Sequence, residues 1–356
     1  MTICCFYDIF THVKISVLIP CHNEEKAIRA CIESCLGQSR PLDEIVVVND
    51  GSTDGTASIL ETFGDKIKVV TLETASGNKS YAQEYGLKHI TGDVFIATDG
   101  DTVLDTHFTR RIEMHFKNPE IEAVCGYIKS IKYNWITACR ELSYILTQDL
   151  HKVAQAYLNA ITVIPGCAGA FRTETYKRCL NFEHDTITED LDFTFKLHEQ
   201  AKNIFYDRKA IIYTQDPGTL TSYVKQMQRW YGGNWQNLFK HYKIFLKPGN
   251  ALELSLNYVE GLLIAVLLFV LPFFFPVVIV YTTGINLAAF LLLGVYGSIS
   301  RKRIDLLIYA PLGVFFAYVD SLIFTEQFFR QCFFRQKKQI WYTPDRRENN
   351  LSAILK

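Results

Sequence analysis

Short apolar runs alternate with amphipathic stretches over the first part of the chain. The runs have the length and the Val and Ile content of buried strands, and the stretches between them repeat their apolar positions at helical spacing. The pattern predicts strands at 14–20, 44–49, 67–72 and 94–97, and helices at 27–38, 56–63 and 81–89. Strands alternating with helices of about ten residues are typical of a doubly wound, mainly parallel sheet. We therefore expect an α/β domain.

The pattern changes at residue 252, after which Leu, Phe, Val and Ile dominate as far as residue 329. The first apolar stretch, 256–281, is long enough to cross a bilayer at about 1.5 Å per residue, and Pro272 and Pro276 are expected to kink it. The second stretch, 285–299, is short for a span, and the third is 306–329. We expect a C-terminal α-helical membrane region with two or three membrane segments.

Basic residues indicate how these segments are oriented, because cytosolic loops are enriched in Lys and Arg. The uncharged turn expected at 282–284 suits the far side of the membrane, and the basic cluster at 301–303 suits the cytosolic side. A third full crossing would place outside the residues Arg330, Arg335, Lys337, Lys338, Arg346 and Arg347. We therefore favour two full spans and a third segment that is re-entrant or interfacial, with three spans as the alternative.

These patterns divide the chain into a cytosolic domain at 14–236, an interfacial connector at 237–250, a membrane region at 251–330 and a basic cytosolic tail at 331–356. The helix leading to the connector is expected to break at Gly232–Gly233. Beyond the break one apolar stripe is formed by Trp235, Leu238, Phe239, Tyr242 and Phe245. Such a stripe is typical of an interfacial helix, and packing on the soluble domain is the alternative.

Composition excludes several other classes of protein. The 356 residues carry 37 basic and 37 acidic side chains, so there is no basic footprint for nucleic acid. Ten cysteines at irregular spacings resemble neither a disulfide framework nor a zinc site, and we expect reduced thiols in the cytosol, with Cys31 and Cys35 packed in the core. Residues 1–13 lack a basic n-region and make a poor signal peptide.

Candidate chemistry begins at the end of the strand 94–97, where Asp99 and Asp101 flank Gly100. Two crowded carboxylates are costly unless a cation holds them, and hard oxygen ligands favour Mg²⁺ or Mn²⁺ shared with substrate phosphates. The alternative is an acidic turn, because Asp and Gly are both common in turns.

Two further polar clusters, 20–24 and 50–55, also follow predicted strands. Since the carboxyl ends of parallel strands share one edge, all three clusters should line one crevice. The chain has neither a dinucleotide fingerprint nor a phosphate loop, so a nucleotide held by carboxylates and a metal fits better. An Asp could accept from a uracil N–H, and Lys79 could add positive charge unless it is only a solvated loop lysine.

The acceptor-side candidates lie further along the chain. The stretch 163–172 places the small residues Gly166, Cys167, Ala168 and Gly169 together, as close approach of a ligand or a tight turn would require. Thr188 is a plausible N-cap for a helix that begins with Glu189 and Asp190 and continues to Asp192. These acids are either ordinary helix-start residues or include a general base for an acceptor hydroxyl.

A later helical stretch, 225–236, places Gln226, Arg229 and Trp230 at helical spacing. An Arg suits a departing diphosphate and a Trp offers a flat face to a sugar ring. An amphipathic helix on a membrane surface would use the same residues.

Together these motifs resemble the processive, membrane-bound family-2 glycosyltransferases, namely the cellulose, chitin, hyaluronan and poly-N-acetylglucosamine synthases. The resemblance covers residues 14 to about 238 and consists of VLIPCHNEE, VVVNDGSTDGT, the Lys79 loop, TDGDT, PGCAGAFR, ITEDLDFTFKL and Q-x-x-R-W (226–230). The tail KKQIWYTPDRR (337–347) is similar to the W-x-S-P-D-R ending of the poly-N-acetylglucosamine synthases.

The resemblance implies a GT-A type mixed sheet and assigns roles by position. Donor-binding roles fall to Cys21, Glu24, Asp50, Lys79, Asp99, Gln226 and Arg229. Asp101 would be the direct metal ligand with Asp99 beside the nucleotide, Asp190 the base with Glu189 next to it, and Trp230 the acceptor platform together with the stretch 166–169. His22 replaces a common Tyr or Phe, and Gly100 a common Ala. No membrane segment precedes Lys14, so we expect either no self-made export pore or one assembled from several chains.

The expected activity is inverting transfer of a sugar from a UDP-sugar, UDP-GlcNAc or a related hexose donor, to a growing β-linked polysaccharide. The expected partners are a glycan or glycolipid acceptor, membrane lipid, and either a second copy or a partner membrane subunit. The expected location is the plasma or inner membrane with a cytosolic catalytic domain. Single transfer to a lipid or short glycan is one alternative, and a non-catalytic subunit that binds nucleotide sugar is another.

Overall fold

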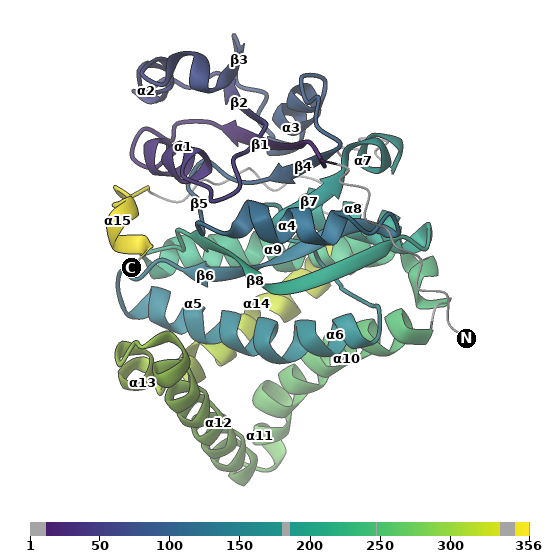
Figure 1. The fold of residues 1–356 in the computed structure, drawn as a ribbon. Coiled ribbons are helices and arrows are strands. Elements are labelled where there is room, and N and C mark those ends of the chain that lie inside the picture. Colours follow the sequence, from purple (N-terminus) through teal and green to yellow (C-terminus); the bar gives the residue numbers. More distant parts are fainter. Residues whose placement is uncertain (1–11, 180–185, 247, 335–345, 356) are drawn as a thin grey trace, which may run out of the picture.

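An eight-stranded mixed sheet forms the centre of the computed structural model (Figure 1), which describes residues 12–179, 186–246, 248–334 and 346–355. The strand order is β3-β2-β1-β4-β7-β6-β8-β5. The first four strands in this order run parallel, and β7 is antiparallel to both of its neighbours. The strands are β1 (Ile15–Cys21), β2 (Glu44–Asp50), β3 (Lys68–Leu72), β4 (Val94–Ala97), β5 (Val103–Leu104), β6 (Ile121–Ser130), β7 (Gly169–Arg172) and β8 (Asn203–Thr214).

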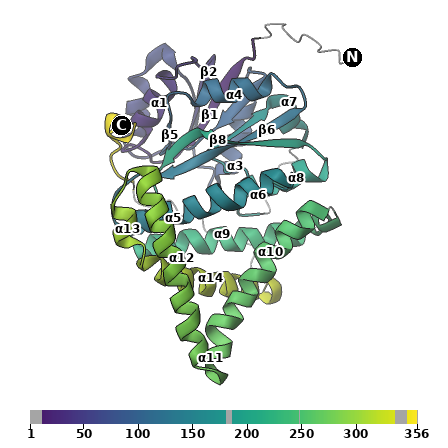
Figure 2. The same ribbon diagram turned by 60° about the horizontal axis from the view of Figure 1, so that its bottom comes forward.

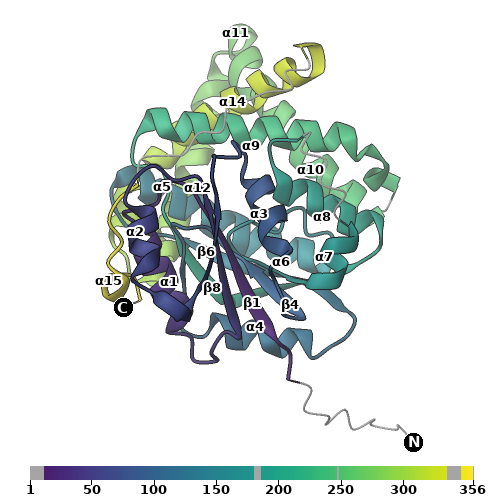
Figure 3. The same ribbon diagram turned by 90° about the horizontal axis from the view of Figure 1, so that it is seen from above.

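Helices cover both faces of the sheet (Figures 1 and 3). One face packs on α1 (Ile28–Leu36), α2 (Thr56–Glu61) and α4 (Phe108–Phe116). The other packs on α3 (Lys79–Leu87), α7 (Thr173–Cys179) and α8 (Glu189–Glu199). The expected doubly wound, mixed α/β sheet is confirmed.

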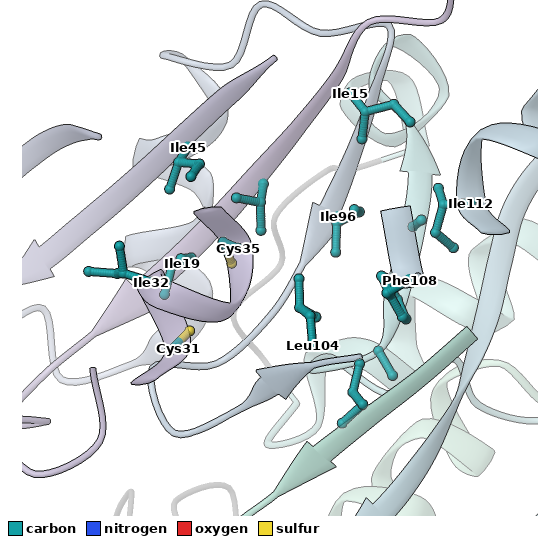
Figure 4. Close-up of a cluster of buried hydrophobic side chains, with 14 of the residues drawn as sticks. Ile15, Ile19, Cys31, Ile32, Cys35, Ile45, Ile96, Leu104, Phe108 and Ile112 are labelled. Carbon is teal, nitrogen blue, oxygen red and sulfur yellow. The ribbon is translucent and has the colours of Figure 1, made fainter. Parts of the chain in front are cut away.

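The core between the sheet and α1 and α4 is shown in Figure 4. Ile19 and Ile96 from the strands meet Ile32 and Phe108 from the helices, and all four are at most 1% exposed. Cys31 and Cys35 lie in the same core as buried free thiols, as the sequence predicted. Strands buried on both faces explain why the predicted runs were apolar without alternation.

The second half of the domain begins with α5 (Trp135–Ile145), which continues through a π-helical turn at Leu146–His151 into α6 (Lys152–Tyr157). It ends with α9 (Leu220–Lys240), a long helix beneath the sheet (Figure 2). After a short 3₁₀ turn at Tyr242–Leu246 the chain enters the apolar region.

The predicted break at Gly232–Gly233 is wrong, because α9 is continuous through both residues. Gly233 serves packing instead: a Cβ at this position would lie 2.3 Å from Thr188 Oγ1. Trp235 and Leu238 are buried in a cluster that joins α8 to the apolar C-terminal region, where the Trp235 ring contacts Tyr258 and Phe324.

The remaining stripe residues differ from these two. Phe239 and Tyr242 are exposed, and the side chain of Phe245 lies outside the described residues. The first half of the stripe is therefore buried between the soluble domain and the apolar C-terminal region, and the interfacial role of the second half stays a prediction.

Three helical stretches are long and apolar enough to cross a membrane: Leu252–Phe274, Val277–Arg301 and Leu312–Phe334. The first comprises α10 (Pro248–Ala265), a π-helical turn at Val266–Val270 and α11 (Leu271–Phe274), and the second is α12 (Val277–Arg301). The turn expected at 282–284 is wrong, since these residues lie inside α12 and the chain reverses at Phe275 and Pro276. Proline restricts the residue before it to extended geometry, and Phe275 has φ −136° and ψ 81°.

The last apolar segment is divided at Pro311 into α13 (Asp305–Tyr309) and α14 (Leu312–Phe334). Helix α14 packs along α9, whereas the α10–α12 hairpin projects away from the sheet (Figure 2). This difference is compatible with an interfacial third segment, and the number of full spans stays a prediction. A final helix, α15 (Leu351–Ile354), lies beside α1 (Figure 1). Residues 1–11 and 335–345 lie outside the described part, and the second range includes most of the tail motif 337–347.

Candidate active site

A cavity of about 1190 Å³ opens along the carboxyl ends of β1, β2 and β4 and continues between α9 and the apolar helices. The three polar clusters predicted to converge do so, because residues from 20–24, from Asp50 and from 99–101 all line it. The lining also includes Cys21, Glu24, Lys79, Gly166, Cys167, Glu189, Asp190, Gln226, Arg229 and Trp230. The sheet topology therefore brings nearly every predicted site residue to one place.

Ala168 and Gly169 are the two predicted site residues that do not line this cavity. Ala168 is fully buried in the core, and Gly169 opens β7. A Cβ on Gly169 would lie 2.6 Å from the ring of Phe171, so this glycine allows close packing within the sheet. Only the first half of the small-residue stretch faces the cavity.

Asp50, at the end of β2, is held by the loop that precedes α3. Its carboxylate accepts hydrogen bonds from the N–H and the hydroxyl of Ser76, both at 2.7 Å. Gly51 makes this approach possible, since it has φ +59° and a Cβ there would lie 2.3 Å from the nitrogen of Ala75. The buried Cys21 thiol lies nearby and donates to the carbonyl of Val48 at 3.4 Å. Hydrogen bonds therefore hold the polar side chains in place at the end of the cavity formed by β1 and β2.

Lys79 connects the two ends of the site. It is the first residue of α3 rather than a loop residue, and Asn78 caps this helix by accepting from the N–H of Ser80. Its Nζ forms an ion pair with Asp99 and lies 3.8 Å from Glu189 Oε1. Burial disfavours the charged form, but these two carboxylates outweigh it and raise the pKa of Lys79. Lys79 is therefore a permanent cation between the Asp99 strand end and the start of α8.

Asp190 is oriented by main-chain groups at the start of α8. Its Oδ2 accepts from the N–H of Gly166 at 3.2 Å, and its Oδ1 accepts from the N–H of Leu191 at 2.9 Å. Glu189 differs because it faces Lys79, and burial raises the pKa of its carboxyl group above the usual range while Lys79 opposes the rise. The two neighbouring acids therefore have different environments.

Thr188 occupies the predicted N-cap position, but its side chain makes no capping hydrogen bond to α8. Asn237 of α9 instead donates from Nδ2 to the Thr188 carbonyl at 3.1 Å and to its hydroxyl at 2.9 Å. Together with the close approach of Gly233, this contact fixes the start of α8 against α9.

Asp192, the third acid of this helix, is a structural residue. Lys240 and His241 at the end of α9 contact its Oδ1 at 2.8 and 2.9 Å, and Lys196 contacts Oδ2 at 2.8 Å. Burial alone would raise the pKa of Asp192, but these donors hold it well below its usual value. Only Glu189 and Asp190 are left to face the cavity.

Trp230 is supported by a buried arginine that the sequence did not indicate. The guanidinium carbon of Arg140 lies 4.9 Å from the Trp230 ring centroid and 4.7 Å from that of Tyr144. Arg140 also pairs with Asp216 at 3.4 Å. Gln226, on the same helix as Trp230, has a buried Oε1 without a hydrogen-bond partner among the described residues. This end of the site thus combines an aromatic face with an available acceptor atom.

Arg346 is the second residue that the sequence did not assign to the site. Its Nε and Nη2 donate to the carboxylate of Glu24 at 2.6–2.9 Å, and its Nη1 lies 2.5 Å from Asp101 Oδ2. Burial raises the pKa of Glu24 to about 7 even though Arg346 opposes the rise. Gly100 leaves room for this pairing, because a Cβ there would lie 3.1 Å from Glu24 Cγ.

The carboxylates of Asp99 and Asp101 fit a divalent cation that takes most of its ligands from outside the protein. Within the described ranges no three His, Cys, Asp or Glu side chains are grouped around a common point. An ion here would take one or two protein oxygens and complete its shell with phosphate and water, as Mg²⁺ at nucleotide sites does. The donor set therefore fits a metal that arrives with a diphosphate.

Comparison with known proteins agrees with this geometry. Residues 16–179 match the glycosyl transferase family 2 model. The chain is 31% identical over 232 residues to poly-beta-1,6-N-acetyl-D-glucosamine synthase of Staphylococcus epidermidis, covering 64% of this chain and 56% of that protein. It is 29% identical over 244 residues to the probable glycosyltransferase YdaM of Bacillus subtilis, covering 66% and 58%. The chain thus spans little more than half the length of these curated relatives.

A solved structure has a similar fold. The mannosyltransferase PcManGT from Pyrobaculum calidifontis, in complex with GDP-Man and Mn²⁺, superposes with a TM-score of 0.57 over 88% of each chain at 20% identity. At this identity the likeness concerns the fold alone. The chain is therefore similar to glycosyl transferase family 2 over residues 16–179, and it combines a mixed α/β domain of GT-A type with helices apolar enough to cross a membrane.

Proposed function

We propose that this protein transfers a sugar, with inversion, from a UDP-sugar to a growing β-linked polysaccharide at the membrane, with UDP-GlcNAc as the donor. The similarity to a poly-N-acetylglucosamine synthase supports the choice of donor and product. The contact that carries the proposal is the placement of Lys79 between Asp99 and Glu189. The side chain of Lys79 contacts both Asp99, at the proposed donor site, and Glu189, at the start of α8. A base at the start of α8 would therefore lie close to a nucleotide-bound sugar.

Asp190 is the better candidate for the general base. Glu189 is committed to Lys79, whereas the oxygens of Asp190 are held only by two main-chain N–H groups and retain lone pairs for a proton. Asp190 takes the proton of the acceptor hydroxyl, the hydroxyl oxygen attacks the anomeric carbon, and the bond from that carbon to the diphosphate breaks. Because the diphosphate is displaced in a single step, the configuration of the anomeric carbon is inverted.

Positive charge is needed where the diphosphate departs. Lys79 and Arg229 line the cavity and would stabilise this charge. A divalent cation held by Asp101 with the diphosphate would add Lewis-acid stabilisation. The ring of Trp230, supported by Arg140, would bind a face of the acceptor sugar.

Single transfer to a glycolipid is a second candidate, favoured by the far end of the cavity. There the lining is formed by α10, α12 and α14 and includes Ile264, Leu267, Leu268 and Phe290. Apolar walls of this kind suit a lipid chain better than a hydrated glycan.

For the arrangement in the membrane we propose a catalytic domain on the cytosolic side of a plasma or inner membrane. The α10–α12 hairpin supplies two full spans, and α14, which packs along α9, forms the interfacial third segment. A second copy or a separate membrane subunit would complete any export path.

The test uses full-length protein in lipid nanodiscs, a panel of UDP-sugars, and sizing of the product. Long polymer from UDP-GlcNAc is the expected result, and turnover should cease in excess EDTA. A one-sugar adduct on added lipid would select the second candidate. Absence of transfer from every donor, with UDP still bound, would indicate a non-catalytic subunit that binds nucleotide sugar.

A further inference from the structure

The described part of the C-terminal tail forms a strap, residues 346–355, across the edge of the catalytic cavity. Gln215, which follows β8, accepts from the N–H of Arg347 at 3.0 Å and donates to its carbonyl at 2.7 Å. Gln215 also donates to Asn349 Oδ1 at 2.8 Å, and the N–H of Asn349 reaches the carbonyl of Lys26 at 3.4 Å. The strap is therefore anchored to both halves of the domain independently of its first residue.

That first residue, Arg346, points into the donor end of the site. Three of its five N–H donors are directed to carboxylates, two to Glu24 and one to Asp101. Its side chain is only 16% exposed, and those of Glu24 and Asp101 are each 6% exposed. A guanidinium placed in this way neutralises the two acids as a bound cation would.

The position of Arg346 conflicts with a divalent cation at Asp101. Oδ2 of this residue is engaged by the guanidinium, and Oδ1 accepts from the hydroxyl of Thr102 at 3.3 Å. A metal ion on Asp101 would therefore lose its better-placed oxygen and would lie beside a fixed charge of the same sign. Displacing Arg346 removes both obstacles, and the anchors at Gln215 and Lys26 allow it without unfolding the domain.

We propose that Arg346 is a tethered cation that competes with the divalent metal for Asp101 and Glu24, so that entry of metal and nucleoside diphosphate displaces the strap from the donor site. The proposal rests on the proposed function only in taking Asp101 as the metal-binding carboxylate. It makes the C-terminal segment an autoinhibitory contact whose release is coupled to donor binding.

The first experiment measures Mn²⁺ affinity by the EPR signal of free Mn²⁺, with full-length protein in nanodiscs and no donor. Arg346→Gln is expected to bind Mn²⁺ about tenfold more tightly than the unmodified chain, a typical coupling between competing ligands. Arg347→Gln is the matched control. It removes the same charge from a side chain that lies 4.1 Å over the ring of Tyr133, and both hydrogen bonds between Gln215 and the main chain of residue 347 remain. Its Mn²⁺ affinity should stay within twofold of the unmodified chain.

The second experiment follows tryptic cleavage after Arg346 by mass spectrometry. Addition of Mn²⁺ with UDP should speed cleavage at this bond severalfold, because displacement exposes it, and Asp101→Asn should abolish the acceleration. Equal cleavage rates with and without Mn²⁺ and UDP would contradict displacement.

Two other outcomes overturn the proposal. Unchanged Mn²⁺ affinity in Arg346→Gln combined with weaker UDP binding would make Arg346 a donor ligand instead of a competitor. Mn²⁺ binding by neither protein, with or without UDP, would remove both the competition and the metal assignment. Competition observed in a protein that transfers no sugar would leave this proposal standing and refute only the proposed function.

Discussion

Replacement of Gly233 by Ala should misplace Asp190, the proposed general base, without changing a residue that lines the cavity. Gly233 lies on α9 opposite Thr188, whose neighbour in sequence opens α8 and whose carbonyl and hydroxyl are held by Asn237. We expect Gly233→Ala to lower kcat by about 10- to 100-fold while UDP affinity changes little, since a displaced base reduces chemistry more than binding.

The magnitude follows from the distances. An added Cβ would lie 2.3 Å from Thr188 Oγ1 and 2.5 Å from its Cγ2. Non-bonded carbon contacts are favourable at about 3.5–4.0 Å, so α8 must retreat by roughly 1 Å or Thr188 must rotate away from Asn237. A shift of about 1 Å at a reacting group costs on the order of a hundredfold in rate. Overpacking costs about 1–3 kcal/mol of stability, and the better helix propensity of Ala returns about 1 kcal/mol.

The assay compares kcat, UDP affinity by calorimetry and thermal midpoint for the unmodified chain and the variant. Gly284→Ala is the control, because it adds the same methyl group to a helix where no atom lies within 4 Å. The double variant Thr188→Ala/Gly233→Ala removes the two closest atoms and leaves the Cβ of residue 188 at 2.9 Å, so it should recover part of the lost kcat. Unchanged kcat in Gly233→Ala, or an equal loss in the double variant, would refute the positioning of α8 by this contact.

Three further predictions concern individual side chains. Asp190→Asn should lower kcat by at least about a thousandfold with UDP affinity within twofold, and a parallel loss of UDP affinity would mean that the base lies elsewhere. Arg140→Met should lower the free energy of unfolding in denaturant titrations by about 3–5 kcal/mol, because it leaves Asp216 buried and unpaired; a loss below about 1 kcal/mol would argue against this pair. Burial lowers the pKa of His241, but hydrogen bonds to Asp192 and Glu199 outweigh it and raise the pKa. The contribution of His241 to the free energy of unfolding should be complete below about pH 6.5 and should be lost as pH rises through the elevated pKa. His241→Gln should make the thermal midpoint less dependent on pH over that range.

The features predicted from sequence are those that depend on local pattern. Four strands and three helices were placed within a few residues, because buried strands and short helices differ in apolar period. Asp50, Asp99 and Asp101 were brought together correctly because parallel strands deliver their carboxyl ends to one edge. The helix start alone left Glu189 and Asp190 open between ordinary capping and catalysis, and the family resemblance indicated that they belong to the site.

The features that were missed depend on contacts distant in sequence. Arg346 and Glu24 are 322 residues apart, and nothing near either residue indicates the other. Arg140 lies in an ordinary helical stretch, and only its burial beside Trp230 shows its role. Two predictions gave too much weight to local sequence. The break predicted at Gly232–Gly233 is absent because helix packing holds α9 continuous there, and the turn predicted at 282–284 is absent because the chain already reverses at Pro276. The place of Arg346 inside the tail motif 337–347 was the one signal that could have suggested a cation for the site.

The packing of α14 along α9 has a consequence for how the proposed activity would depend on the membrane. One side of α9 carries Arg229 and Trp230 into the cavity, while Tyr223 of the same helix donates to Asp320 of α14 at 2.7 Å. A change in bilayer thickness that tilts the α10–α12 hairpin, which packs on α14, is therefore expected to move α9 and the proposed acceptor platform at Trp230. Acyl-chain length becomes a variable of the reaction, and reconstitution in thin and thick bilayers should alter turnover even when every substrate is saturating.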